Sequence, residues 1–169
     1  MQRNSDFIVV IPARYGSKRF PGKPLKRIMG IPMIIRTCLQ CLKIVKNSQL
    51  VVATDDIKIK KCCEKYSINS ILTSKKCKTG TDRVAEVAKK IKARNYINVQ
   101  GDEPIFNPDD LSKILKESKR SKNKILLGYT KIKNRINCNN KNIPKVVFDK
   151  NENLLYASRN PIPFVNLNE

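Results

Sequence analysis

The feature that most constrains the fold is Phe7–Ile11, an unbroken run of five apolar residues of which four are β-branched. Such a run predicts a strand buried on both faces, as is typical of parallel sheets, and Pro12 is expected to end it. Shorter apolar runs predict further strands over 50–53, 70–73 and 96–99.

Segments with helical periodicity alternate with these strands. Apolar residues recur at helical spacing from Pro32 to Val45, and helices are also predicted over 57–66, 81–91 and 107–117. This alternation predicts βαβ units, and therefore an α/β fold with a mainly parallel sheet flanked by helices.

The pattern changes after residue 120. A strand-like segment is expected over 125–131, and the runs 145–148 and 154–157 on either side of a polar turn predict an antiparallel hairpin. No repeat or clear linker interrupts the chain, so a single domain over 1–169 is expected.

Composition bounds the class of protein. The 169 residues carry 35 Lys and Arg against 14 Asp and Glu, a net charge of +21, and 40% of them are hydrophobic. That hydrophobic share is enough for a core and excludes wholesale disorder. No apolar run approaches the ~20 residues of a spanning helix, and Phe7–Ile11 is too short for a signal peptide. We therefore expect a soluble, cytoplasmic protein.

The positive charge has two interpretations. It would attract polyanions, so a basic module that binds nucleic acid with steep salt dependence is one hypothesis. However, the excess is mostly Lys in a chain also rich in Asn and Ile, which share AT-rich codons, and the basic residues are spread along the chain. Aromatic residues make up only 6%, so no dedicated nucleic-acid partner is expected.

The chain has six cysteines and no histidine. Cys38 and Cys41 form a C-x-x-C pair, but they lie in a predicted helix with no second pair to complete a metal site. Reduced thiols that face the core are therefore expected, with a redox pair as the alternative. Without His, catalysis must use Lys, Arg, carboxylates, backbone amides or a metal.

Two loops that follow predicted strands carry unusual chemistry. The segment Pro12–Pro24 combines Gly, Pro, Arg and Lys, which suits a backbone cradle for phosphate but also fits a basic surface loop. Asp102, in Gln100-Gly-Asp-Glu-Pro104, is placed to hold Mg²⁺ beside nucleotide phosphates, although Gly-Asp is also a common turn. Since ligands gather at the carboxyl ends of parallel strands, the pair suggests phosphoryl or nucleotidyl transfer.

Four ordered motifs carry a family resemblance: Ile11-Pro-Ala-Arg-Tyr-Gly-Ser-Lys-Arg-Phe-Pro-Gly-Lys-Pro-Leu25, Val52-Ala-Thr-Asp55, Thr79-Gly-Thr-Asp-Arg83 and Asn98-Val-Gln-Gly-Asp-Glu-Pro104. Together with 144–149 and 155–163 they resemble the 3-deoxy-manno-octulosonate cytidylyltransferases, or CMP-Kdo synthetases. The CMP-sialic acid synthetases share part of the first motif, but Phe20–Leu25 and Gln100–Pro104 favour Kdo. The resemblance implies a Rossmann-like nucleotidyltransferase sheet.

The resemblance also implies a reaction, in which the anomeric hydroxyl of Kdo attacks the α-phosphorus of CTP and pyrophosphate leaves. The implied catalytic residues are Arg14, Lys23 and Asp102, with Mg²⁺ on Asp102. The implied nucleotide-binding residues are Ala13, Arg14, Gly16, Ser17, Arg19, Lys23, Gly80, Thr81 and Arg83. Gln100 and Arg159 would face the substrate, Arg159 near the sugar-acid carboxylate. For Arg83, a surface position on the helix is the alternative.

Family members continue beyond the position that matches Glu169, so this chain is expected to lack their C-terminal part. That part would supply a second Mg²⁺-binding Asp, a His and a Glu near the sugar, and much of a homodimer contact. Two alternatives to Kdo transfer follow: an inactive remnant that still binds CTP, and a cytidylyltransferase for another sugar acid such as 8-amino-Kdo or sialic acid.

Overall fold

The structure, a computed structural model, describes residues 5–16, 20–120 and 125–163. The chain divides into two compact units, residues 1–124 and 125–169, and each is considered by itself. The single nucleotidyltransferase domain expected over 1–169 stays a prediction, since two compact units can belong to one domain.

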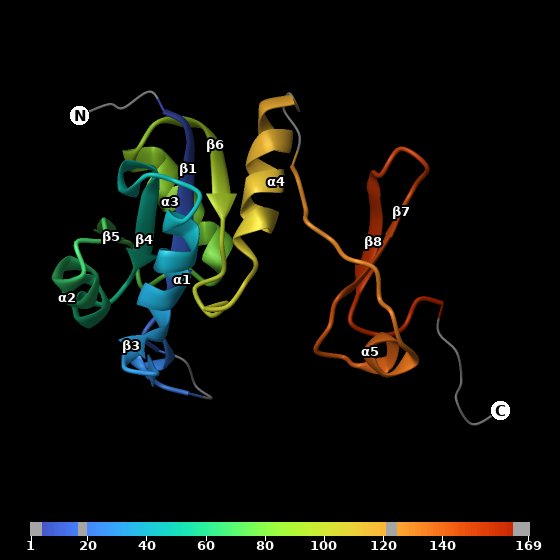
Figure 1. Cartoon of the computed structure of the whole chain (residues 1–169), viewed down its shortest axis with the longest axis horizontal. Coiled ribbons are helices and arrows are strands. Elements are labelled where there is room, and N and C mark those ends of the chain that lie inside the picture. Colours follow the sequence, from blue (N-terminus) through green and yellow to red (C-terminus); the bar gives the residue numbers. More distant parts are fainter. Residues whose placement is uncertain (1–4, 17–19, 121–124, 164–169) are drawn as a thin grey trace. The chain divides into compact units, whose positions relative to one another are not determined.

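The first unit is built on a four-stranded parallel sheet with strand order β5-β4-β1-β6 (Figure 1). The strands are β1 (Ser5–Ala13), β4 (Leu50–Thr54), β5 (Ser70–Leu72) and β6 (Ala93–Asn98). This confirms the predicted parallel sheet. Ala13 pairs with Thr54 at the ends of β1 and β4, so the loops that follow these strands emerge at one edge.

One strand boundary differs from the prediction. Pro12 does not end β1, which continues to Ala13, with Pro12 paired in register with Ala53. Proline is tolerated there because the position is almost at the strand end, where one missing backbone donor interrupts little of the ladder.

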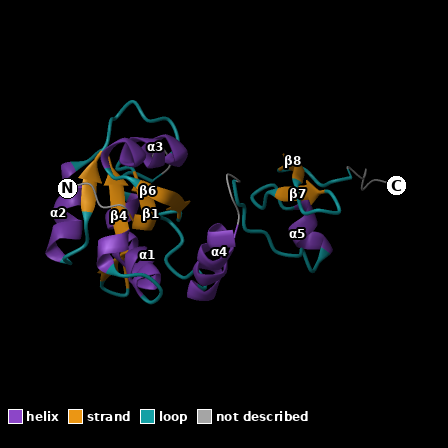
Figure 2. Cartoon of the chain, turned by 90° about the horizontal axis from the view of Figure 1, so that it is seen from above, coloured by secondary structure: helices purple, strands orange, loops and turns teal. Residues whose placement is uncertain are grey.

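Helices cover both faces of the sheet (Figure 2). They are α1 (Met33–Leu42), α2 (Ile57–Lys65), α3 (Gly80–Lys90) and α4 (Pro108–Arg120). Val9 and Ile11 of β1 pack with apolar residues of α1, α2 and α4, whereas Ile8 and Val10 pack with Val87 of α3. The alternation of side chains along β1 therefore produces two apolar layers, as the double burial of this strand predicts.

The cysteine prediction is confirmed for the C-x-x-C pair. Cys38 and Cys41 are fully buried in the core and carry no disulfide. Burial raises the pKa of Cys41 to about 12, so this thiol stays protonated at neutral pH. Within the described residues, no three His, Cys, Asp or Glu side chains gather where they could hold a metal.

Several short elements were not predicted. Lys23–Leu25 and Asn47–Gln49 form 3-10 turns (η1 and η2), and β2 (Arg27–Ile28) pairs with β3 (Ile31–Pro32). Pro32 therefore ends a small hairpin and caps α1, which begins at Met33. No helix in the described part of the chain is long and apolar enough to cross a membrane.

The second unit contains α5 (Arg135–Asn139) and an antiparallel pair, β7 (Lys145–Phe148) and β8 (Leu154–Ser158). The hairpin prediction is confirmed, with Val146 opposite Ala157. The strand expected over 125–131 is wrong: this segment is irregular, and Ile125 is fully exposed. In the described structure this apolar segment has no neighbouring strand to supply backbone partners.

Candidate functional site

A cavity of about 290 Å³ lies at the carboxyl ends of β1 and β6. Its lining residues come from the ends of these strands and the loops that follow them, from the start of α1 and from the start of α3. They are Pro12, Ala13, Arg14, Lys23, Pro24, Met33, Cys77, Lys78, Thr79, Gly80, Arg83, Gln100, Gly101 and Asp102. The position is where parallel sheets collect their ligands.

One side of the cavity is formed by Arg14 and Lys23, which end the segment 14–23. We name this segment, of which residues 14–16 and 20–23 are described, the cationic loop. The Gly22 amide donates to the Tyr15 carbonyl at 3.0 Å, so the loop closes on itself between these residues. Gly22 has φ 68°, and a Cβ there would lie 3.3 Å from the Tyr15 ring. Glycine therefore suits this closure in both conformation and space, and it directs Arg14 and Lys23 to the cavity.

Lys23 and Asp102 join the two loops that the sequence singled out. The Lys23 ammonium lies 2.6 Å from the Asp102 carboxylate, and the two side chains are 39% and 52% exposed. Because both remain accessible to solvent, the pair contributes only ~0–1 kcal/mol to stability. Either group is therefore available to a ligand of opposite charge.

The backbone that carries Asp102 is fixed at Gly101. A Cβ at Gly101 would lie 2.7 Å from the Pro12 carbonyl oxygen, which belongs to the backbone of β1. The Thr37 hydroxyl of α1 donates to the Gly101 carbonyl at 3.2 Å. The absence of a side chain thus lets the loop after β6 contact the end of β1 directly.

The other side of the cavity is residues 73–79, which we name the α3 loop. Asp82 accepts hydrogen bonds from the Lys78 and Thr79 amides at 2.9 and 2.8 Å, and Thr79 caps α3 in return. The Thr79 hydrogen bonds lower the pKa of Asp82. This reciprocal capping fixes the loop against the first turn of α3.

Glu86 holds the same loop from the second turn of α3. It accepts from the Ser74 amide at 2.8 Å and from the Cys77 thiol at 3.1 Å. The Ser74 bond lowers the pKa of Glu86, whereas desolvation and then the bond to Glu86 raise the pKa of Cys77. Cys77 therefore serves as a neutral donor in the cavity wall.

Arg83 is buried, with its side chain 3% exposed. Its guanidinium donates to the Asp55 carboxylate at 2.7 Å, to the Thr73 hydroxyl at 2.7 Å and to the Ser74 carbonyl at 3.2 Å. The alternative of a surface arginine is therefore wrong: Arg83 lies under the cavity and ties the end of β4 to the α3 loop.

A model of the cytidylyltransferase family matches residues 8–169. The chain belongs to this cytidylyltransferase family. It is 41% identical over 164 residues to a 3-deoxy-manno-octulosonate cytidylyltransferase of Polynucleobacter necessarius, a match that covers 95% of this chain and 64% of that protein. The corresponding Escherichia coli enzyme is 36% identical over 160 residues, covering 95% and 65%. The chain thus spans about two thirds of the length of these curated relatives.

A solved structure supports the same relationship. The structure of CMP:2-keto-3-deoxy-manno-octonic acid synthetase complexed with CTP superposes with a TM-score of 0.84 at 34% identity, covering 97% of this chain and 68% of that one. This similarity confirms the predicted nucleotidyltransferase fold.

The structure gathers seven of the predicted site residues in this cavity. They are Ala13, Arg14, Lys23, Gly80, Arg83, Gln100 and Asp102. Gly16 and Thr81 are exposed and are not among the lining residues, and Ser17 and Arg19 lie outside the described residues. Arg159, in the second unit, donates to the carbonyls of Lys141 and Asn142. The roles of all these residues stay predictions.

Sequence reasoning missed several lining residues. Cys77 and Lys78 belong to the α3 loop, outside the motifs that the sequence singles out, and Met33 belongs to a segment whose apolar spacing predicts a helix that faces the core. Cys77 and Lys78 could have been suspected from the sequence, because they lie between a predicted strand and the start of a predicted helix. Met33 could not have been found in this way, because its position in the apolar pattern is the same as that of a core residue.

Proposed function

We propose that this protein transfers CMP from CTP to 3-deoxy-D-manno-octulosonate (Kdo), forming CMP-Kdo and releasing pyrophosphate. One observation carries the proposal: the cationic loop and Asp102 meet across the Lys23–Asp102 contact in a single cavity at the sheet edge. The similarity to Kdo cytidylyltransferases supports the choice of nucleotide and sugar acid.

The cavity supplies positive charge where a triphosphate needs it. Arg14 and Lys23 line one side, and Lys78 lines the other. In the reaction, the anomeric hydroxyl oxygen of Kdo forms a bond to the α-phosphorus and releases its proton to solvent, while the bond from that phosphorus to the pyrophosphate oxygen breaks. Cations placed before the reaction stabilise the charge that develops on the leaving pyrophosphate.

Mg²⁺ is the proposed cofactor, and the residues present fit one mode of holding it. The Asp102 carboxylate is half exposed in the cavity and already neutralises a cation, the Lys23 ammonium. Mg²⁺ is commonly bound through one or two carboxylates together with substrate phosphates and water, so a lone Asp102 suffices if CTP completes the shell. When bound, the ion would neutralise phosphate charge.

Lys23 has a specific part in this proposal. In the free protein its ammonium is paired with Asp102. A triphosphate offers more negative charge than one carboxylate, so Lys23 transfers to the phosphates when CTP binds and leaves Asp102 free.

Gln100 is proposed to face the sugar or the nucleotide, and Arg159 the carboxylate of the sugar acid. A homodimer and a cytoplasmic location stay predictions.

The test is calorimetric titration of the 169-residue chain with CTP, followed by pyrophosphate release with CTP, Mg²⁺ and Kdo. Lys23→Ala is expected to weaken CTP binding by about tenfold or more, because it removes a charge-assisted contact worth ~1.5–3 kcal/mol. Lys61→Ala, which removes an exposed lysine of α2, is the matched control for charge.

The outcomes separate the hypotheses. Kdo-dependent pyrophosphate release supports the transferase. CTP binding without release from a folded sample would indicate a protein that binds CTP but does not turn it over. Equal effects of Lys23→Ala and Lys61→Ala, with affinity that falls steeply with salt and is indifferent to the base, would favour a general polyanion binder.

A further inference from the structure

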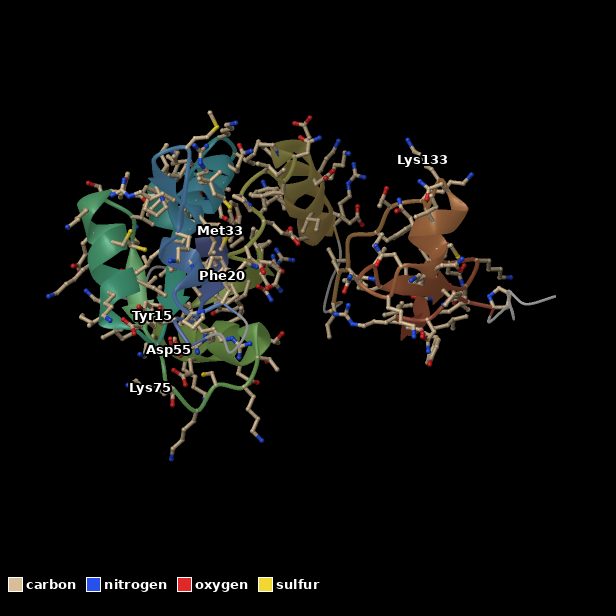
Figure 3. The ribbon with its side chains drawn as sticks, turned by 90° about the horizontal axis from the view of Figure 1, so that it is seen from below. Tyr15, Phe20, Met33, Asp55, Lys75 and Lys133 are labelled. Carbon is tan, nitrogen blue, oxygen red and sulfur yellow. The ribbon has the colours of Figure 1, made fainter. Side chains whose placement is uncertain are left out.

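We propose that Asp55 is a positioning residue that joins the two sides of the cavity through one carboxylate. Asp55 directly follows β4, and its side chain is 16% exposed. Oδ1 accepts from the Tyr15 backbone amide at 3.3 Å, and Oδ2 accepts from the Arg83 guanidinium at 2.7 Å. In Figure 3, Tyr15 and Asp55 lie side by side. The link to CTP rests on the proposed function.

Tyr15 is the residue at which the cationic loop is held. Its amide donates to Asp55, its carbonyl accepts from Gly22, and its ring lies against Gly22 and under the Lys58 ammonium, 4.7 Å from the ring centre. Arg14 immediately precedes Tyr15, and Lys23 immediately follows Gly22. Fixing the Tyr15 backbone therefore fixes the points from which both cations enter the cavity.

Arg83 extends the connection to the α3 loop. Nη2 of Arg83 donates to Asp55, and Nη1 donates to the Thr73 hydroxyl and the Ser74 carbonyl. The guanidinium fork thus holds β4 and the α3 loop in one geometry. Through Asp55 this geometry reaches Tyr15, so both sides of the cavity depend on the same buried ion pair.

Only a carboxylate can make both of Asp55's contacts. The Tyr15 amide and the guanidinium are both donors, and an ionised Asp presents two acceptor oxygens and no donor. In an Asp55→Asn variant, one donor must face the amide NH₂ group. The buried Arg83 guanidinium keeps the remaining oxygen, because leaving this buried charge without an acceptor costs more than leaving the Tyr15 amide without one. The Tyr15 amide then loses its acceptor, and the cationic loop is released first.

Amide hydrogen exchange by NMR tests this connection without any ligand. In the unsubstituted chain the Tyr15 amide is expected to be protected. Asp55→Asn is expected to raise its exchange rate about tenfold or more, the effect of losing one buried hydrogen bond, while amides of β1 and β4 stay protected. The control is Asp56→Asn at the next residue, which instead caps α2 through the Lys58 amide. A Tyr15 amide that exchanges freely in the unsubstituted chain, or that responds equally to both variants, overturns the proposal.

A second variant keeps the test independent of whether Asp55→Asn folds. Arg83→Lys leaves a cation for Asp55 but removes the fork that also reaches Thr73 and Ser74. We expect the Tyr15 amide to stay protected in this variant and the Cys77 amide to exchange faster, because the Cys77 amide donates at 3.3 Å to the Ser74 carbonyl that Arg83 holds. Unchanged exchange at Cys77 would remove Arg83 from the proposal.

Titration with CTP and with CMP gives a readout that a purely structural role would not produce. If Asp55 positions the cationic loop for the triphosphate, Asp55→Asn weakens CTP binding by about tenfold and CMP binding much less. Equal losses for both nucleotides contradict positioning of this loop. If the unsubstituted chain binds neither nucleotide, the proposed function fails, while the exchange experiment still decides whether Asp55 joins the two sides.

Discussion

The two sides of the cavity are held in different ways. The α3 loop is fixed by three side chains of α3: Asp82, Arg83 and Glu86 bond its backbone or side chains at several positions. The described part of the cationic loop is held mainly at Tyr15, through Asp55 and Gly22. Among the described residues, the α3 loop has more of these anchors and contributes one cation to the cavity lining, Lys78, whereas the cationic loop contributes Arg14 and Lys23.

This difference suggests a division of labour. In the proposed function Lys23 exchanges partners when a triphosphate binds. It lies on the side with fewer anchors among the described residues, where the ion pair is exposed and weak. The α3 loop, which has more anchors, sets the shape of the cavity, because charged groups with fixed hydrogen bonds cannot also rearrange at low cost. Four changes can break or sharpen this comparison.

Gly101→Ala is expected to have the largest effect, because Gly101 lines the cavity and packs directly against the backbone of β1. The new methyl group would meet the Pro12 carbonyl oxygen at 2.7 Å, a backbone atom that cannot turn aside. Overpacking of this kind costs ~1–3 kcal/mol. Thermal unfolding is expected to show a clearly lower Tm together with weaker CTP binding. An unchanged Tm would show that the loop after β6 tolerates displacement.

Thr79→Ala tests the side with many anchors. It removes the hydroxyl that caps α3, a loss that typically costs ~1 kcal/mol. Urea unfolding measures the free energy, and Thr81→Ala, at an exposed position two residues further on, is the control. Equal effects of the two variants would mean that the cap contributes nothing beyond the loss of side-chain bulk.

Acid is expected to loosen the α3 loop through the two carboxylates of α3 that hold it. The pKa of Asp82 and that of Glu86 lie below their ordinary values of 3.8 and 4.5 because backbone amides donate to both carboxylates. Groups with a lowered pKa in the folded state stabilise it above their unfolded-state pKa, and that contribution is lost as pH falls through the folded-state value. The loss therefore begins below about pH 4.5.

The measurement is the Tm as a function of pH for the unsubstituted chain and for Asp82→Asn combined with Glu86→Gln. The variant is expected to show the flatter profile over this acidic range. Parallel profiles would show that these carboxylates do not govern the stability of the α3 loop.

Lys23→Ala is expected to have the smallest effect on stability, within ~0–1 kcal/mol, because its ion pair with Asp102 is exposed. The same variant has a large expected effect on CTP affinity. Urea unfolding in the absence of nucleotide checks the first expectation. A loss of stability comparable to that of Gly101→Ala would contradict the idea that the cationic loop contributes binding more than rigidity.

Much of the fold follows from local pattern. Val9 and Val10 belong to a run that is apolar at every position, and both are fully buried, on opposite faces of the sheet. The strand predicted over 125–131 is wrong because a short apolar run such as Ile125–Leu127 indicates a strand only if a partner strand is present. Pairing is a property of the surroundings, which local periodicity does not contain.

The site shows the same limit. Lys23 and Asp102 were selected from two loops by residue type and strand-end position, and the structure places them in contact. Arg83 could not be placed on the surface or in the interior from its helix alone. Asp55 was noted within a motif, but its two donors come from residues 40 and 28 positions away in the sequence.

The sequence by itself determined the order of strands and helices, the parallel sheet and the loops that carry charge, because short-range periodicity and strand-end position encode them. Only the tertiary structure decided which charges are paired and which are available. Arg83 is buried against Asp55 while Lys23 stays exposed beside Asp102. Burial and partner choice depend on groups that the fold brings together from distant segments, and they set the electrostatic role of each residue.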